Sequence, residues 1–295
     1  MSAALDRLGS APYRDPVAAI DWSAADPALP WLPPRMLSLA GLEAQAQMSA
    51  DTVVRFSRVE FARLCAAGLW LEGLLISRVT CGGFLAASTD EARIMLREVR
   101  EESGHSLMFL EMIDRAGLSG VPLLGSTGLL TWVAHRLDAG DAEFWAMVYV
   151  GESVTDTFAV RALRHAEEAG AAICPVARQV LSLHHRDEAR HIAAAREFLE
   201  VRVAAMTPLR RRLFSATLRF LLGRFLRATL YPTAASLRGL GLAQPERAAR
   251  AARTCPERRR LARACAAPAL RFMARSGLLR GRDGRQKAIA RRGQS

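Results

Sequence analysis

The stretch of sequence that decides the fold is His184-His185-Arg186-Asp187-Glu188-Ala189-Arg190-His191. His184, Glu188 and His191 stand at positions i, i+4 and i+7, and a helix of about 3.6 residues per turn brings these positions to one face. Two imidazoles and a carboxylate are costly to bury without partners. The pattern therefore indicates a metal-binding face, and the spacing leaves open the alternative that His185 points inward in place of His184.

A second segment repeats part of this pattern. In Glu101-Glu102-Ser103-Gly104-His105, the residues Glu102 and His105 form a Glu-x-x-His pair, as Glu188 and His191 do. In both segments another acidic residue precedes the glutamate of the pair. Two such pairs on two long helices, with one glutamate from each of two further helices, are how the core of a helix bundle holds two metal ions.

The two further glutamates occur in apolar surroundings. Glu152 is the only acid from residue 144 to residue 155, and Glu72 is the only charged residue between positions 63 and 78. A lone carboxylate among apolar side chains needs a strong partner, for which a cation is well suited. Glu60 is a weaker candidate for the first of these helices because arginines surround it in the sequence.

Four carboxylates and three imidazoles are therefore the predicted metal ligands. They are Glu72, Glu102, His105, Glu152, His184, Glu188 and His191. Each motif is common by itself, and the prediction depends on their order, one per long helix. Mixed oxygen and nitrogen donors suit iron or manganese. A ligating histidine usually donates its second ring N–H to a carboxylate, so we expect Asp187 to support His105 and Glu101 to support His191 across the bundle.

Helical periodicity, interrupted by glycine and proline, extends from residue 50 to residue 230 and predicts an all-α helix bundle. The expected helices cover about 50–79, 88–116, 129–137, 141–170, 175–206 and 209–230. Residues 1–49 are rich in proline and are predicted to form an arm on the bundle domain of residues 50–244. Residues 245–295 are predicted to be an arginine-rich C-terminal extension that forms short helices or stays mobile.

The formal net charge of +12 lies in this extension, because residues 246–295 contain 15 basic and 3 acidic residues. A solvated or subunit-packing tail is the first interpretation. An acidic protein partner, such as a carrier protein that bears the substrate, is the second, since basic surfaces steer acidic ones. Nucleic acid is the least favoured partner because Phe272 is the extension's only aromatic residue and no binding module is recognisable.

Several classes of protein are excluded. The single lysine, Lys287, is not part of a Gly-Lys-Ser/Thr phosphate loop, and neither GxGxxG nor GxSxG occurs. Five cysteines without a CxxC pair argue against zinc-ribbon, iron–sulfur and disulfide frameworks. No signal-peptide pattern and no apolar run of about 18 residues occurs, so we expect a reducing, cytoplasmic setting and no membrane span.

With these motifs the sequence resembles the ferritin-like di-iron carboxylate superfamily. The segment from Asp187 to His191 looks like the DExRH signature of that superfamily. The additional His184 is similar to the p-aminobenzoate N-oxygenase (aureothin-type) family, in which a HxxxExxH helix supplies an extra imidazole to one iron. The resemblance covers roughly residues 50–205. It implies a ferritin-like four-helix bundle with additional N- and C-terminal helices and two iron ions.

The resemblance also implies a reaction, with O2 as co-substrate and an external electron donor, either a reductase or a chemical reductant. An amine nitrogen, on an aryl amine above all, would be oxidised through hydroxylamine and nitroso to nitro in secondary metabolism. One alternative is a di-iron oxygenase that acts on C–H bonds of a small or carrier-bound substrate. Only the presence of His184 argues against this alternative. Another is a non-catalytic ferritin-like metal-binding protein. The oligomeric state stays open, a homodimer being common among such relatives.

Overall fold

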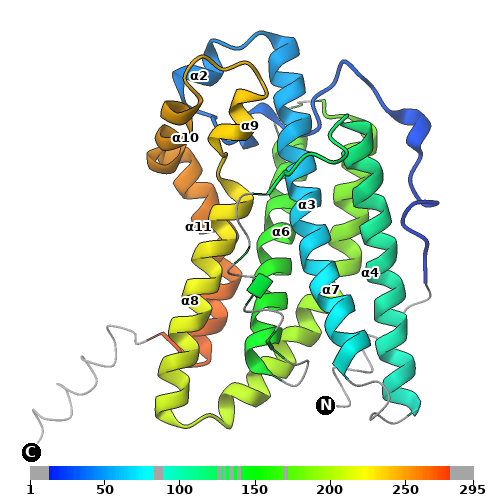
Figure 1. Cartoon of the computed structure of the whole chain (residues 1–295), viewed down its shortest axis with the longest axis vertical. Coiled ribbons are helices and arrows are strands. Elements are labelled where there is room, and N and C mark those ends of the chain that lie inside the picture. Colours follow the sequence, from blue (N-terminus) through cyan, green and yellow to red (C-terminus); the bar gives the residue numbers. More distant parts are fainter. Residues whose placement is uncertain are drawn as a thin grey trace, which may run out of the picture.

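Four long helices run side by side in the computed structural model, which describes residues 13–82, 89–124, 141–168 and 172–279 and positions 128, 131–132, 136–137 and 170 (Figure 1). They are α3 (Ala50–Gly82), α4 (Thr89–Arg115), α6 (Ala142–Glu168) and α7 (Pro175–Ala204). α3 packs mainly against α4, and α6 packs mainly against α7. The described residues contain no strand, and the predicted all-α, ferritin-like bundle is confirmed.

The ends of these helices follow local sequence signals. Pro175 occupies the first turn of α7, and Pro208 occupies the first turn of α8 (Pro208–Leu230), where a missing N–H costs nothing. The observed bounds lie within three residues of the predicted ones. The predicted helix over 129–137 falls largely outside the described residues. None of the described helices has the length and apolar character that crossing a bilayer requires.

The N-terminal arm contains the short helices η1 (Trp22–Ala24), η2 (Pro34–Met36) and α2 (Glu43–Ala46). Its first part lies along α4 and α7. The guanidinium of Arg100 on α4 stacks on the Tyr13 ring, and the backbone N–H of Asp21 donates a hydrogen bond to Gln179 on α7 at 2.9 Å. The arm then enters the hydrophobic core, where Leu32, Met36, Leu37 and Leu39 are buried. The predicted arm is thus an integral layer of the molecule.

Three further helices follow α8 at the C-terminal end: α9 (Ala234–Arg238), α10 (Pro245–Thr254) and α11 (Pro256–Arg275). α11 packs on α6 and α8 and buries Cys265, Ala269 and Phe272 completely. The described part of the predicted extension therefore contributes to the core, and its arginines are exposed apart from Arg258. The division at residue 245 is one of composition rather than of packing.

A buried ion network joins the arm, α3, α8 and α11. Glu60 accepts hydrogen bonds from the backbone N–H and hydroxyl of Ser38 and forms an ion pair with Arg63 at 3.1 Å. Arg258 approaches the same carboxylate at 3.7 Å and donates to the backbone carbonyls of Met36 and Leu230. Glu60 is therefore satisfied by structural partners and lies outside the donor cluster formed by the predicted ligands.

We expect the substitution Arg258→Met to lower the free energy of unfolding by about 3–5 kcal/mol, because it leaves buried carbonyls without a donor and removes one partner of a buried carboxylate. Urea denaturation followed by circular dichroism measures this change. Arg263→Met, at an exposed position of the same helix, is the control and should stay within about 0.5 kcal/mol. Equal effects of the two substitutions would contradict the structural role of the network.

Candidate metal centre

The seven predicted ligands all lie in the middle of the bundle with buried side chains, none more than 7% exposed. They come from all four long helices. Glu72 is on α3, Glu102 and His105 are on α4, Glu152 is on α6, and His184, Glu188 and His191 are on α7. The structure thus brings side chains separated by more than a hundred residues into one interior cluster, called the donor cluster below.

One half of the donor cluster gathers around the Oε1 atom of Glu188. The Nδ1 atom of His105 and the Nε2 atom of His184 each lie 3.3 Å from this oxygen. The Oε1 atom of Glu72 lies 3.7 Å from His184 Nε2. One donor atom from each of these four residues lies within 4.8 Å of the other three, which is a spacing that a single metal ion can span.

The other half gathers around the Nδ1 atom of His191, which lies 3.1 Å from Glu102 Oε1 and 3.1 Å from Glu188 Oε2. The second oxygen of Glu102 lies 3.1 Å from His105 Nδ1. Glu102 and Glu188 therefore each direct one oxygen towards each half of the cluster. Two carboxylates in this arrangement are suited to bridging a pair of metal ions.

Glu152 stands beside this arrangement rather than within either half. Its carboxyl interacts electrostatically with Glu188, Glu102 and His191. Burial, followed by the charge of Glu188, raises the pKa of Glu152 well above its usual value. Burial and the neighbouring Glu102 do the same for the pKa of Glu72. The two glutamates that were identified from their apolar neighbours are thus the two that resist ionisation most.

The histidines of the cluster differ from one another in the direction of their pKa shifts. Burial lowers the pKa of His184 to about 4, so that its imidazole is neutral near neutral pH. Burial also acts to lower the pKa of His105, but Asp187 and Glu102 outweigh it and raise that pKa to about 10. A neutral imidazole presents a free lone pair, which is what a metal ion requires of a ligand.

Unsatisfied polar atoms provide a test of whether a cation fits here. Glu72 Oε1, His184 Nε2 and Glu188 Oε1 are buried and have no hydrogen-bond partner among the described residues. Such atoms are rare in protein interiors because each loses its hydration without compensation. All three belong to the same half of the cluster and carry lone pairs, so a metal ion fits their arrangement and chemistry.

His184 and not its neighbour His185 belongs to the donor cluster. The His184 ring packs 5.0 Å from the ring of Phe109, and Phe109 in turn fills the space above Gly68, where an added Cβ would lie 2.3 Å from it. His185 is partly exposed and pairs with Asp156 on α6. The alternative that the sequence left open, an inward His185, is therefore wrong.

The residues behind the histidines agree only in part with expectation. Asp187 Oδ2 lies 3.5 Å from His105 Nε2, in the predicted position. Glu101 lies 3.6 Å from His191 Nε2, but its carboxylate accepts a hydrogen bond from Arg190 at 2.6 Å. Glu98, which the sequence analysis missed, lies closer to that nitrogen, at 2.9 Å. Its position one helical turn before Glu102 was the available signal.

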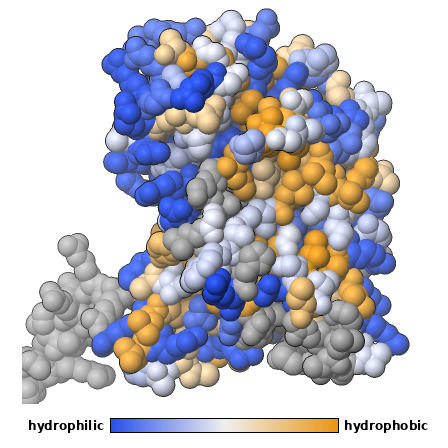
Figure 2. Space-filling model, viewed as in Figure 1, coloured by the Kyte–Doolittle hydropathy of each residue, from blue (hydrophilic) through white to orange (hydrophobic). Residues whose placement is uncertain are grey.

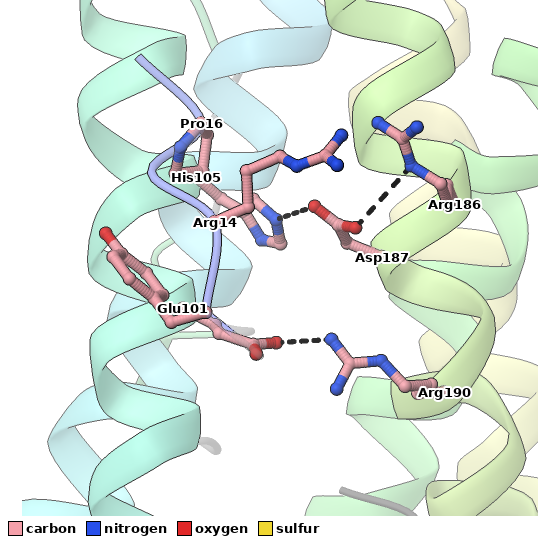
Figure 3. A pocket seen from close by; sticks show the side chains of 8 residues that line it. Arg14, Pro16, Glu101, His105, Arg186, Asp187 and Arg190 are labelled. Carbon is pink, nitrogen blue, oxygen red and sulfur yellow. Dashed lines mark hydrogen bonds and ion pairs between the residues drawn. The ribbon is translucent and has the colours of Figure 1, made fainter. Parts of the chain in front are cut away.

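A cleft of about 480 Å³ opens on the outer side of this arrangement (Figure 3). Side chains of Arg14, Arg186 and Arg190 surround Asp187 there, and the outer edge of His105 forms part of its wall. The arm crosses α4 at Gly104, where an added Cβ would lie 2.7 Å from Pro16. Through Asp187 the cleft connects solvent to His105, whose other nitrogen faces the donor cluster.

Comparison with known proteins agrees with this geometry. The sequence model of the family described as P-aminobenzoate N-oxygenase AurF matches residues 3–277, nearly the whole chain. The chain belongs to the p-aminobenzoate N-oxygenase family. The family that His184 and the following Glu-x-x-His pair indicated from sequence is therefore confirmed.

Similar curated relatives of this N-oxygenase family member are an uncharacterized protein of Mycobacterium bovis and two uncharacterized proteins of Mycobacterium tuberculosis strains. Each is 30% identical over 210 residues, which are 68% of this chain. The match spans 58% of each relative, so the chain covers less than two thirds of their length.

We expect the affinity for ferrous iron to fall as the pH falls. Protons held by the Glu72 and Glu152 carboxyls, whose pKa values are raised, must leave when a cation binds, and a lower pH keeps them in place. Calorimetric titrations in buffers of different ionisation enthalpy at about pH 6.5 should show proton release. Glu72→Gln should release fewer protons, whereas exposed Glu168→Gln should match the wild type. Metal binding without proton release would contradict this prediction.

We also predict that Glu98 orients His191. Removing the carboxylate in Glu98→Ala should weaken iron binding about 10–100-fold, because the ring loses the partner nearest to its outer nitrogen. Glu98→Gln keeps an acceptor oxygen and should recover most of the affinity. Anaerobic iron titration measures both, with Glu111→Ala on the outer surface of α4 as control. Wild-type affinity in a folded Glu98→Ala protein would be the opposing outcome.

Proposed function

We propose that this protein is a non-haem di-iron oxygenase that oxidises the nitrogen of an amine, with an aryl amine as the expected substrate class. The observation that carries the proposal is the third imidazole. His184 Nε2 lies inside the donor cluster, 3.3 Å from Glu188 Oε1 and 3.7 Å from Glu72 Oε1. Membership of the p-aminobenzoate N-oxygenase family supports the same reaction.

Charge balance supports two divalent ions in the cluster. The ions would be held by Glu72, Glu102, His105, Glu152, His184, Glu188 and His191. Four carboxylates offset the four positive charges of two ferrous ions, and three neutral imidazoles add donors without adding charge. A neutral total matters because a net charge in a dry interior is strongly destabilising. When bound, the iron pair supplies the redox chemistry that activates O2.

An apolar space lies between α3, α6 and α8 and is lined by Trp70, Met147, Val150, Leu221 and Phe225. Its volume of about 10 Å³ is far below that of an aryl ring. Trp70 and Val150 precede Glu72 and Glu152 by two residues, and side chains two apart on a helix point to different faces. The expectation of an aryl substrate therefore comes from family membership and not from this space.

The first oxidation converts the amine to a hydroxylamine. One atom of O2 enters the new N–O bond, the other leaves as water, and two electrons and two protons come from outside the protein–substrate complex. Later oxidations through nitroso to nitro would complete the sequence, as expected for a role in secondary metabolism. We place the electron donor outside this chain, in a reductase or a chemical reductant, and we place the reaction in the cytoplasm.

The test is incubation of iron-loaded protein with p-aminobenzoate, a chemical reductant and isotopically labelled O2. We expect mass spectrometry to detect labelled hydroxylamine, nitroso or nitro products. His184→Ala should lower their formation at least about tenfold, because one of the two imidazole nitrogens that lie 3.3 Å from Glu188 Oε1 is lost. His185→Ala, at the neighbouring partly exposed position, is the matched control and should retain activity.

Other products would overturn the proposal. Label on ring carbon alone would identify a C–H hydroxylase, and iron mineral without organic product would identify a storage protein. Full N-oxygenation by His184→Ala would remove the reason for assigning the third imidazole to this reaction.

A further inference from the structure

A second cleft, of about 560 Å³, lies between the arm, α6 and α11. Its polar lining consists of four arginines, one histidine and one acid. They are Arg35, Arg161, Arg258, Arg260, His165 and Glu257. It contains none of the seven cluster residues. Arg161 follows Glu152 by nine residues along α6, which corresponds to roughly 13 Å of helix. The cleft is therefore separate from the candidate metal centre, and its role is independent of the proposed oxygenase function.

The single acid in the cleft does not balance these cations. Glu257 forms its ion pair with Arg260, at 2.8 Å, so these two charges cancel each other. Arg35 and Arg161 have no acidic partner among the residues that the structure describes. They come from different parts of the chain, the arm and α6, and both are exposed at the cleft. Two guanidinium groups are thus left without a counter-charge.

The floor of the cleft adds a further excess of positive charge. Arg258, only 4% exposed, lines the cleft and shares the Glu60 carboxylate with Arg63. Two guanidinium groups therefore face one carboxylate in the interior. Because charges in a poorly hydrated environment are screened weakly, this excess reaches the cleft more strongly than an exposed arginine would.

We propose that this cleft binds a small anion with two or more negative charges, carried by phosphate or carboxylate groups, through Arg35 and Arg161. A guanidinium binds either group with two parallel hydrogen bonds, and two of them on facing elements can hold both ends of one dianion. Arg258 at the floor favours the bound charge electrostatically. The volume suits a small molecule of this kind.

The surroundings favour the same ligand. Residues 245–279 contain nine arginines and two glutamates, and Figure 2 shows hydrophilic side chains gathered over the end of the molecule where α2 and α10 lie. Such a surface concentrates small anions near the cleft. Nucleic acid fits less well, because no Phe, Tyr or Trp lines the cleft and single strands bind largely by stacking on aromatic rings.

Isothermal titration of the full chain at constant ionic strength tests the proposal. Inorganic phosphate and glycerol 3-phosphate probe the phosphate group, and succinate probes the carboxylates. We expect at least one of them to bind with one site per chain. Arg35→Gln and Arg161→Gln should each weaken that binding about tenfold or more. Arg164→Gln, an exposed position of α6 that does not line the cleft, should stay within about twofold.

Each outcome of these titrations either supports or overturns the proposal. Binding of phosphates alone, of succinate alone or of both supports the proposal and identifies the preferred group. No binding above a chloride background would overturn it, as would equal weakening by Arg164→Gln, which would indicate a diffuse surface effect. Binding of an oligonucleotide or an acidic peptide without any of the small anions would also overturn it. Circular dichroism of each variant verifies the fold, and none of these measurements depends on oxygenase activity.

Discussion

Burial of seven ionisable side chains in the middle of a helix bundle is the constraint on which the rest of the structure depends. Burial opposes the charge of every carboxylate in the cluster. His191 offsets this for Glu102 and Glu188 and lowers their pKa values. The pKa values of Glu72 and Glu152 are raised, because burial and neighbouring carboxylates act on both, and for Glu152 they outweigh the attraction of His191. Without cations, protons on the Glu72 and Glu152 carboxyls therefore reduce the negative charge of the interior. With two divalent ions the four carboxylates balance it directly.

The helices that carry the donors do not by themselves fix the width of the cluster. Direct packing is extensive within the pairs α3–α4 and α6–α7, and the two pairs are joined largely by segments outside the bundle. α8 contacts both α3 and α6 on one side, and on the other side the arm reaches α4 through Tyr13 and α7 through Gln179. The buried network around Glu60 then ties the arm to α3 and α11. The peripheral segments thus help to set the donor–donor distances.

Sequence alone could predict the parts of the site that depend on one helix at a time. The spacing of His184, Glu188 and His191 fixes a common face, and apolar neighbours identified Glu152 because only a buried helix face has them. The missed residue, Glu98, stands between two arginines in sequence and looks like a surface position. Which acid meets His191 depends on Arg190 drawing Glu101 away, a contact between helices. The long-range part of the Glu60 network was likewise out of reach, since Ser38 and Arg258 come from distant segments.

The surroundings of the donor cluster differ between its two sides, and this difference bears on how a reaction could be organised there. The outer nitrogens of His105 and His191 face carboxylates, those of Asp187 and Glu98, and an open cleft reaches Asp187. Glu72 and Glu152 come from α3 and α6, and α8 packs against both of these helices with apolar side chains between them. Protons can therefore exchange on the polar side, whereas apolar packing excludes water on the other. The carboxylates that α4 and α7 carry behind their histidines, together with the cover that α8 provides over α3 and α6, create this polarity.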